Sequence, residues 1–248
     1  MLELFFGTTN PGKLRELRRL VGGLQVRVVS PDELGRPLPD VLEDGLTFRE
    51  NAEKKAAAYA RAASRHALAD DSGLCVDALS GAPGVHSARW SELEDGLASP
   101  ACGLRGAADR ELGMELSAAA RAEANNDKLL RALRGREGAQ RDGSYVAVLA
   151  LAAPDGRILA TVEGSCRGRI GHVRLGTNGF GYDPLFVPEA ELVQLRREVG
   201  AAAGRPIRSP RTMAQLEPAE KDALSHRGAA FRAVRPILEQ LAFDKKGR

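Results

Sequence analysis

The feature that most constrains the fold is an apolar run that leads through a turn into helical spacing. Residues 2–6, LELFF, are apolar enough to form a buried strand. The triplet Asn10-Pro11-Gly12 is typical of a turn. The apolar residues after it recur at helical spacing, at Leu14, Leu17, Leu20 and Val21. A strand, a loop and a helix in this order place a helix N-terminus beside the loop and favour an α/β fold.

The same loop contains part of a phosphate-binding motif. Gly7, Gly12 and Lys13 match the G-x-x-x-x-G-K of a P-loop, but the next residue is Leu14 instead of the Ser or Thr that binds magnesium. The loop still offers hydroxyls, an amide and a cation at a helix start, where peptide dipoles favour anions. From this segment alone two interpretations stay open: a phosphate site with its metal held elsewhere, or an ordinary strand–turn–helix connection.

Helices and strands alternate along the rest of the chain. Strands are expected at 25–29, 66–69, 74–76, 145–151 and 157–162, with a hairpin turn at 154–156. Helices are expected from the Thr47–Glu50 capping box to about 65, in a segment reaching Leu133, and at 229–241. No internal repeat interrupts this order, so we predict one α/β domain over residues 1–248 with a mixed sheet.

Composition narrows the class of protein. The 248 residues are 43% hydrophobic and 28% charged, as expected of a folded chain. No apolar run approaches a membrane span and no secretion signal opens the chain, so we expect a cytoplasmic protein without membrane contact. The three cysteines, Cys75, Cys102 and Cys166, show no C-x-x-C spacing. A net charge of +3 without a basic stripe argues against nucleic acid as a partner.

Two acidic pairs are candidates for a metal site. Glu43-Asp44 precedes the capped helix, and Asp70-Asp71 is expected in a turn between the strands at 66–69 and 74–76. Magnesium usually takes one or two protein carboxylates and completes its shell with water and phosphate oxygens. Surface acids and Asp-Asp-Ser-Gly turns are also common, so each pair alone leaves a purely structural interpretation open.

Two further segments contain ligand-binding chemistry. In residues 176–184, GTNGFGYDP, glycines surround Phe180 and Tyr182, which would let an aromatic ring stack on a flat ligand. Lys221 and the segment Ser225-His226-Arg227-Gly228 supply a dense set of hydrogen-bond donors. A glycine-rich turn with core aromatics and a solvated basic loop are the structural alternatives.

Taken together, these segments resemble one known family. The stretches TTNPGK, EDGLTFRENAEKKA, ALADDSGLCVDAL, GAPGVHSARW, GTNGFGYDPLF and TMAQLEPAEKDALSHRGAA follow one another between residue 4 and about 240. In this order they are similar to the inosine triphosphate pyrophosphatase family, whose members are also called dITP/XTP or non-standard purine NTP pyrophosphatases. The P-loop interpretation is then no longer needed.

The resemblance implies a reaction and a set of residues. The expected reaction is magnesium-dependent cleavage of ITP, dITP or XTP between the α and β phosphates, giving a monophosphate and pyrophosphate. Glu43 and Asp71 are expected to hold Mg²⁺, with Asp71 also acting as the base toward water. The residues expected to bind the nucleotide are Thr8, Thr9, Asn10, Pro11, Gly12, Lys13, Ser72, Phe180, Gly181, Tyr182, Asp183, Lys221, His226 and Arg227.

The resemblance also implies an architecture. The expected fold is an elongated, two-lobed α/β structure around a long mixed β-sheet flanked by helices, with the active site in the cleft and a homodimer as the usual assembly. Two stretches exceed the family pattern, at about 92–122 and 189–211. The second contains Arg196, Arg197, Arg205, Arg208 and Arg211, which could extend over the cleft, but a solvated surface insertion is the favoured interpretation.

Selectivity for the base has a physical rationale. Hypoxanthine and xanthine present an oxygen at C6 where adenine presents an amino donor, so donors from Arg227, His226 or nearby backbone would favour the former. Two alternatives remain at this stage: a related pyrophosphatase for modified pyrimidine or other nucleotides, and a non-catalytic nucleotide sensor. Phe180 and the Ser225-His226-Arg227 segment favour purines. Lys13, Glu43 and Asp71 argue against a sensor, which would not need metal-binding carboxylates.

Overall fold

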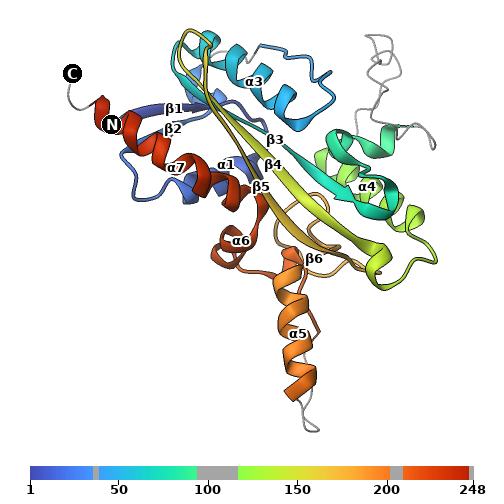
Figure 1. The fold of residues 1–248 in the computed structure, drawn as a ribbon. Helices are drawn as coiled ribbons and strands as arrows, with labels where there is room; N and C mark the ends of the chain where they lie inside the picture. Colours follow the sequence, from blue (N-terminus) through green and yellow to red (C-terminus); the bar gives the residue numbers. More distant parts are fainter. Residues whose placement is uncertain (36–38, 94–116, 202–208, 246–248) are drawn as a thin grey trace. The chain divides into compact units, whose positions relative to one another are not determined.

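The computed structural model describes residues 1–35, 39–93, 117–201 and 209–245. In that part of the chain, six strands form one sheet in the order β2-β1-β3-β4-β5-β6 (Figure 1). Strand β1 pairs in parallel with β2 and β3, whereas β5 and β6 are antiparallel, so the sheet is mixed as predicted. The strands are β1 (Leu2–Phe6), β2 (Val26–Val29), β3 (His66–Val76), β4 (Asp142–Ala152), β5 (Ile158–Ile170) and β6 (Phe186–Pro188).

Helices separate most of the strands. They are α1 (Pro11–Leu20), α2 (Pro31–Leu34), α3 (Phe48–Ala63), α4 (Ala118–Ala132), α5 (Glu189–Ala201), α6 (Pro218–Leu224) and α7 (His226–Asp244). Short 3-10 turns include η1 (Asp77–Leu79), η2 (Gly84–His86), η3 (Trp90–Glu92), η5 (Gly138–Arg141) and η6 (Met213–Gln215). Among the described residues, no helix is both long and apolar enough to cross a membrane.

The chain groups into two compact units, each built from separate stretches of sequence. The first contains residues 1–72, 146–165 and 225–248, and the second contains residues 73–145 and 166–224. Strands β3, β4 and β5 each contribute residues to both units.

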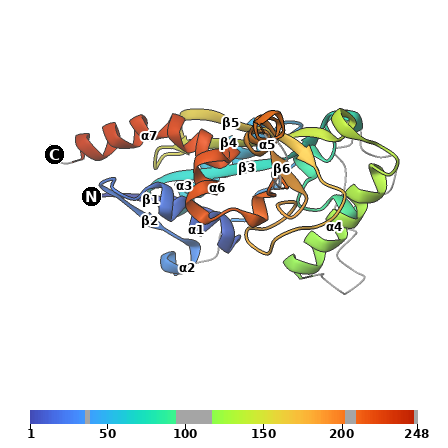
Figure 2. The same ribbon diagram turned by 90° about the horizontal axis from the view of Figure 1, so that it is seen from below.

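The first unit has three layers because its strands are apolar on both faces. Leu2, Leu4 and Phe6 of β1 pack with side chains of α1 and α7, including Leu17 and Phe231. The intervening Phe5 packs on the other face with side chains of α3, such as Ala56 and Tyr59. This follows from the alternation of side chains along a strand. Figure 1 shows α3 on one side of these strands and α1 and α7 on the other, and Figure 2 shows β1, β2 and α1 together near the N-terminus.

The second unit has its own apolar core. Its buried members include Leu74, Trp90, Leu129, Tyr145 and Phe186. The rings of Tyr145 and Phe186 lie 4.6 Å apart between centroids, so the ends of β4 and β6 are packed together. The unit therefore holds its own loops in place through buried aromatic and aliphatic contacts.

Local signals in the sequence identify most elements correctly. The capping box of α3 is complete, with the Thr47 side chain and the Glu50 side chain each accepting from the other's backbone N–H. The hairpin turn between β4 and β5 lies where it was predicted, closed by a hydrogen bond from the Ala153 N–H to the Arg157 carbonyl. The strands on both sides of it are longer than predicted, because their polar residues alternate with buried ones.

One prediction is wrong. Asp70-Asp71-Ser72-Gly73 forms no turn, and residues 66–76 make a single strand of 11 residues. The prediction failed because Asp-Asp-Ser-Gly is a favourable turn sequence, whereas here both carboxylates are buried in the strand and paired with cations. A strand tolerates such residues when ion pairs compensate each charge.

The two predicted insertions are only partly described. Residues 94–116 of the first lie outside the described part of the chain, and its end forms the start of α4. The second begins as helix α5, Glu189–Ala201, where no helix was predicted. Arg205 and Arg208 lie outside the described residues.

Candidate active site

The side chain of Asn10 organises the loop between β1 and α1 through hydrogen bonds to the backbone. Its side-chain oxygen accepts from the Gly12 N–H at 2.8 Å and the Lys13 N–H at 3.2 Å, so Asn10 caps the helix, with Pro11 at its first position. The backbone N–H groups of Gly12 and Lys13, at the start of α1, therefore already have a hydrogen-bond acceptor. Thr8 and the exposed Thr9 remain as hydroxyl groups of the loop, and Thr8 Oγ1 accepts from the Asn10 N–H.

Gly7 has a packing reason to be glycine. A Cβ at this position would lie 2.1 Å from the ring of Tyr59, which comes from α3. The apparent first glycine of a P-loop is thus explained by close contact between the strand end and a buried aromatic ring.

Adjacent carboxylates on β3 point to opposite faces of the sheet. Asp70 contacts residues of α1 and α7, and Asp71 contacts a residue of α3. The separation follows from the two-residue period of a strand. Two neighbouring acids therefore enter two different environments.

On its own face, Asp70 accepts charged hydrogen bonds from two cations. Oδ1 lies 2.8 Å from Lys13 Nζ and Oδ2 lies 2.5 Å from Arg227 Nε. Arg227 also donates Nη1 to Glu16 Oε2 at 2.5 Å and Nη2 to Ser72 Oγ at 2.9 Å. Burial alone would raise the pKa of Asp70, but Arg227 and Lys13 outweigh it and hold that pKa well below 3.8. Asp70 is therefore an ionised anchor for both cations.

On the other face, Lys55 of α3 joins two carboxylates. Its Nζ lies 2.8 Å from Asp71 Oδ1, 2.9 Å from Glu43 Oε2 and 3.0 Å from the Asp70 carbonyl oxygen. Burial would lower the pKa of Lys55, but Asp71 and Glu43 outweigh it and raise the pKa. The ammonium is thus a fixed positive charge between the two acids.

Asp71 and Glu43 differ in protonation behaviour. Burial raises the pKa of Asp71 to about 6, against the opposing effect of Lys55. Burial also acts to raise the pKa of Glu43, but there the charge of Lys55 prevails and the pKa is lowered. Asp71 is the stronger base of the two, since a raised pKa increases the affinity of a carboxylate for a proton.

These carboxylates fit the requirements of a magnesium ion. Asp71 Oδ2 is buried and meets no hydrogen-bond donor among the described residues, so it is available as a ligand. No group of three or more acidic, histidine or cysteine residues suited to a metal occurs in the described ranges. Magnesium requires only one or two protein carboxylates when phosphate and water fill the other positions.

The start of α7 brings His226 and Arg227 to the first unit. Ser225 caps the helix by accepting from the Gly228 N–H at 3.1 Å, and both His226 and Arg227 are buried. Gly164 of β5 permits the close approach, because a Cβ there would lie 2.2 Å from the Ala230 nitrogen and 2.3 Å from the His226 carbonyl oxygen. The position of the Arg227 guanidinium thus depends on a glycine in a neighbouring strand.

In the second unit, residues 176–184 form a compact loop organised by Asp183. Its Oδ2 accepts from the Phe180 N–H at 2.8 Å and from Lys221 Nζ at 2.7 Å. Lys221 lies 4.8 Å from the centre of the Phe180 ring. Tyr182 is buried and donates its hydroxyl to the Ser87 carbonyl at 3.0 Å, which makes it a structural anchor. Phe180 is only half-buried, as a stacking platform requires.

Comparison with known proteins then assigns the family. The Ham1 family matches residues 4–237. The chain belongs to the Ham1 family. It is 64% identical over 242 residues to a protein named dITP/XTP pyrophosphatase in Anaeromyxobacter dehalogenans, covering 97% of this chain and 99% of that one. A protein of the same name in Streptomyces avermitilis is 41% identical, covering 97% and 99% of the two chains.

Solved Ham1 structures confirm the fold class. The Ham1 protein of Coxiella burnetii is 31% identical with a TM-score of 0.67, covering 100% of both chains. The Ham1 protein of Staphylococcus aureus is also 31% identical with a TM-score of 0.67, covering 96% of this chain and 98% of the other. The resemblance inferred from the motifs is thereby confirmed.

Two residues of this Ham1 chain that contact the predicted site were missed in the sequence. Lys55 and Glu16 are both buried, and each pairs with residues that the motifs had identified. For Lys55 a signal was present: it lies on the face of α3 that also carries the buried residues Ala52, Ala56 and Tyr59. A lysine on an apolar helix face needs a buried counter-charge.

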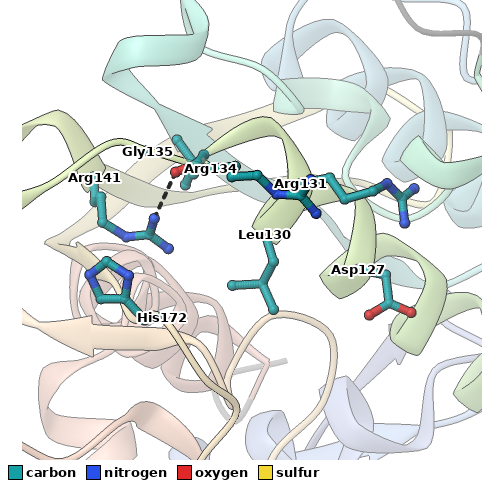
Figure 3. A pocket seen from close by; sticks show the side chains of 8 residues that line it. Asp127, Leu130, Arg131, Arg134, Gly135, Arg141 and His172 are labelled. Carbon is teal, nitrogen blue, oxygen red and sulfur yellow. Dashed lines mark hydrogen bonds between the residues drawn. The ribbon is translucent and has the colours of Figure 1, made fainter.

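A pocket of about 390 Å³ in the second unit contains none of the predicted site residues. Its lining includes Arg131, Arg134, Arg141 and His172 (Figure 3). Arg141 donates to backbone carbonyls, including that of Leu133 at 2.9 Å. Its guanidinium therefore closes the C-terminal end of α4.

Proposed function

We propose that this Ham1 chain is a Mg²⁺-dependent pyrophosphohydrolase that cleaves dITP, ITP and XTP between the α and β phosphates. The observation that carries the proposal is the convergence of Glu43 and Asp71 on the Lys55 ammonium, at 2.9 and 2.8 Å. Relatives named dITP/XTP pyrophosphatase, matched over nearly their whole length, support the choice of substrates.

In the proposed reaction, Asp71 accepts a proton from the attacking water at its Oδ2 atom. This oxygen is buried and without a hydrogen-bond donor in the described structure, and burial has raised the pKa of the group. The P–O bond to the pyrophosphate leaving group breaks as the water oxygen bonds to the α phosphorus. Mg²⁺ held by Glu43 and Asp71 would neutralise charge on the phosphate oxygens.

Lysine side chains supply the remaining positive charge. Lys13 is held by Asp70 beside the Thr8–Asn10 loop, and Lys55 is fixed between the acids. Phosphoryl transfer depends chiefly on such positioning and charge neutralisation. Arg227, whose donors reach Asp70, Glu16 and Ser72, supports this arrangement by orienting Asp70. The proposal keeps His226 as a donor toward the C6 oxygen of the base, whereas the Arg227 guanidinium, whose three nitrogens already donate, acts through Asp70.

In this proposal, the loop that contains Phe180 recognises the purine base. Its half-buried ring would stack on a purine, and Lys221 and Asp183 would hold the loop in place. Stacking is insensitive to the identity of the base, so selectivity must come from hydrogen bonds. A cytoplasmic location and a homodimer complete the proposal.

The substitution Asp71→Asn tests the chemistry. We expect pyrophosphate release to fall by at least about a hundredfold, while dITP binding, measured by titration calorimetry, stays within about threefold of wild type. Asp77→Asn, at an exposed aspartate after β3, is the matched control and should leave turnover unchanged. Full activity in the Asp71 variant would exclude this residue as the base. Binding without turnover in the wild-type protein would instead support a nucleotide sensor.

A further inference from the structure

Helix α4 carries three buried polar side chains on the face toward the core of the second unit. Asn125 accepts from the Ser91 N–H at 2.7 Å and donates to the Ser87 and Ala88 carbonyls. Lys128 donates to the Trp90 carbonyl at 3.1 Å and to the Leu93 carbonyl at 2.6 Å. These two residues hold the segment 87–93. The third, Asn126, bonds to a different part of the unit.

Asn126 contacts the loop of Phe180. Its Nδ2 donates to the Gly181 carbonyl at 3.1 Å, and the residue is only 1% exposed. Its Oδ1 is also buried and, among the described residues, has no hydrogen-bond donor. A buried amide with an unmatched acceptor lowers stability compared with an apolar residue of the same size. The stability of α4 therefore does not explain why residue 126 is an asparagine. The hydrogen bond from the Asn126 side chain to Gly181 does explain it.

The loop needs such an anchor because glycines flank the ring. Gly179 has φ of +79° and Gly181 has φ of +63°, conformations that favour glycine. Glycine also leaves the peptide units on both sides of Phe180 with little intrinsic preference for one conformation. Asp183 accepts from the Phe180 N–H, and Asn126 donates to the Gly181 carbonyl, so backbone groups before and after the Phe180 side chain in the sequence are both held.

We propose that Asn126 is a positioning residue for base recognition, which holds the Gly181 peptide and thereby orients Phe180 for stacking on the purine. This inference rests on the proposed function, in which Phe180 meets the base. It implies that loss of the Asn126 donor weakens contact with the base and leaves recognition of the triphosphate intact. A general loss of folding would affect both.

The test uses Asn126→Ala, which removes the donor, and Asn126→Asp, which keeps the shape but replaces the donor with an acceptor. Each is assayed for dITP turnover and for inhibition by inorganic tripolyphosphate, which has no base. We expect the KM for dITP to rise about tenfold, as partial loss of stacking implies, with kcat within about twofold of wild type. The inhibition constant of tripolyphosphate should stay within about twofold. Arg131→Gln, at an exposed residue of the same helix, should change none of these values.

Each outcome decides the question. An unchanged KM in both variants, or a KM and an inhibition constant that rise together, would overturn the assignment. If one variant does not fold, as judged by circular dichroism, the other decides. If neither folds, Asn126 is a core residue and the assignment is wrong. A wild-type protein that releases no pyrophosphate from dITP would refute the proposed function itself, and this inference with it.

Discussion

Arg227 of α7 donates its Nε to Asp70 Oδ2 of β3 at 2.5 Å, and the two residues are only 3% and 6% exposed. The same guanidinium reaches Glu16 of α1, so one cation joins three elements of the first unit. A buried charge without its partner is strongly destabilising, typically by about 3–5 kcal/mol. This pair is therefore needed both for folding and for the position of Lys13.

The first prediction concerns acid stability. The pKa of Asp70 lies well below 3.8 in the folded chain, so the carboxylate stabilises the fold above the unfolded pKa. This contribution decreases as the pH falls from about 5 toward the depressed folded pKa. We expect Asp70→Asn to be about 3–5 kcal/mol less stable than wild type at pH 7, with a smaller gap at pH 3.5. Urea unfolding followed by circular dichroism measures both values, and a gap that does not change with pH would contradict the ion-pair account.

A second prediction concerns Gly164. A Cβ at this position would approach the backbone of α7 to 2.2 Å, so Gly164→Ala must displace the helix start that carries His226 and Arg227. We expect a loss of about 1–3 kcal/mol in unfolding free energy and at least about a tenfold loss of pyrophosphate release. The control is Gly171→Ala, where the nearest atom would be 3.4 Å away. Equal activity in the two variants would show that the close approach is unimportant.

A third prediction concerns Lys55. The substitution Lys55→Met leaves Glu43 and Asp71 without their shared cation, and we expect turnover of dITP to fall by about a hundredfold. Repulsion between the two carboxylates should also make the variant more dependent on Mg²⁺ for stability. Its melting temperature should therefore rise more than that of wild type when Mg²⁺ is added. Lys54→Met, which removes an exposed lysine of the same helix, serves as the control. A Lys55 variant with normal turnover would remove this residue from the mechanism.

A fourth prediction concerns Cys166. Burial raises the pKa of its thiol to about 11 from an ordinary 9.0, so the reactive thiolate is about a hundredfold scarcer at pH 8. Mass spectrometry after iodoacetamide treatment should show modification of Cys166 at least about a hundredfold slower in the native chain than in 8 M urea, the reference condition. Comparable rates in the two conditions would show that the thiol is exposed.

Local sequence patterns were sufficient to predict the structural features that depend only on neighbouring residues. The Thr47–Glu50 capping box and the turn at Asn10-Pro11-Gly12 need only neighbouring residues, and both were predicted. The strand through Asp70 and Asp71 was missed because its stability depends on distant partners. Arg227 lies 157 positions after Asp70 in the sequence, and no local sequence pattern predicts that the two side chains form an ion pair.

The candidate site shows the same difference between features set by local sequence and contacts between distant residues. The motifs predicted site roles for Lys13, Asp71 and Arg227, which stay predictions, yet they gave no indication that Asp70 and Asp71 point to opposite faces of one strand. The role of Asn126 could not be predicted from the sequence either, because 55 positions separate Asn126 from Gly181. Such contacts depend on tertiary packing, which a local pattern does not contain.

Pyrophosphate release tests the central claim most directly. The purified chain is incubated with dITP, ITP, XTP, ATP, GTP and modified pyrimidine triphosphates, each with and without Mg²⁺. We predict release of pyrophosphate and the nucleoside monophosphate from dITP, ITP and XTP only, and only with Mg²⁺. Release from ATP or from pyrimidine nucleotides at similar rates would contradict the base assignment, and release of orthophosphate would contradict cleavage between the α and β phosphates.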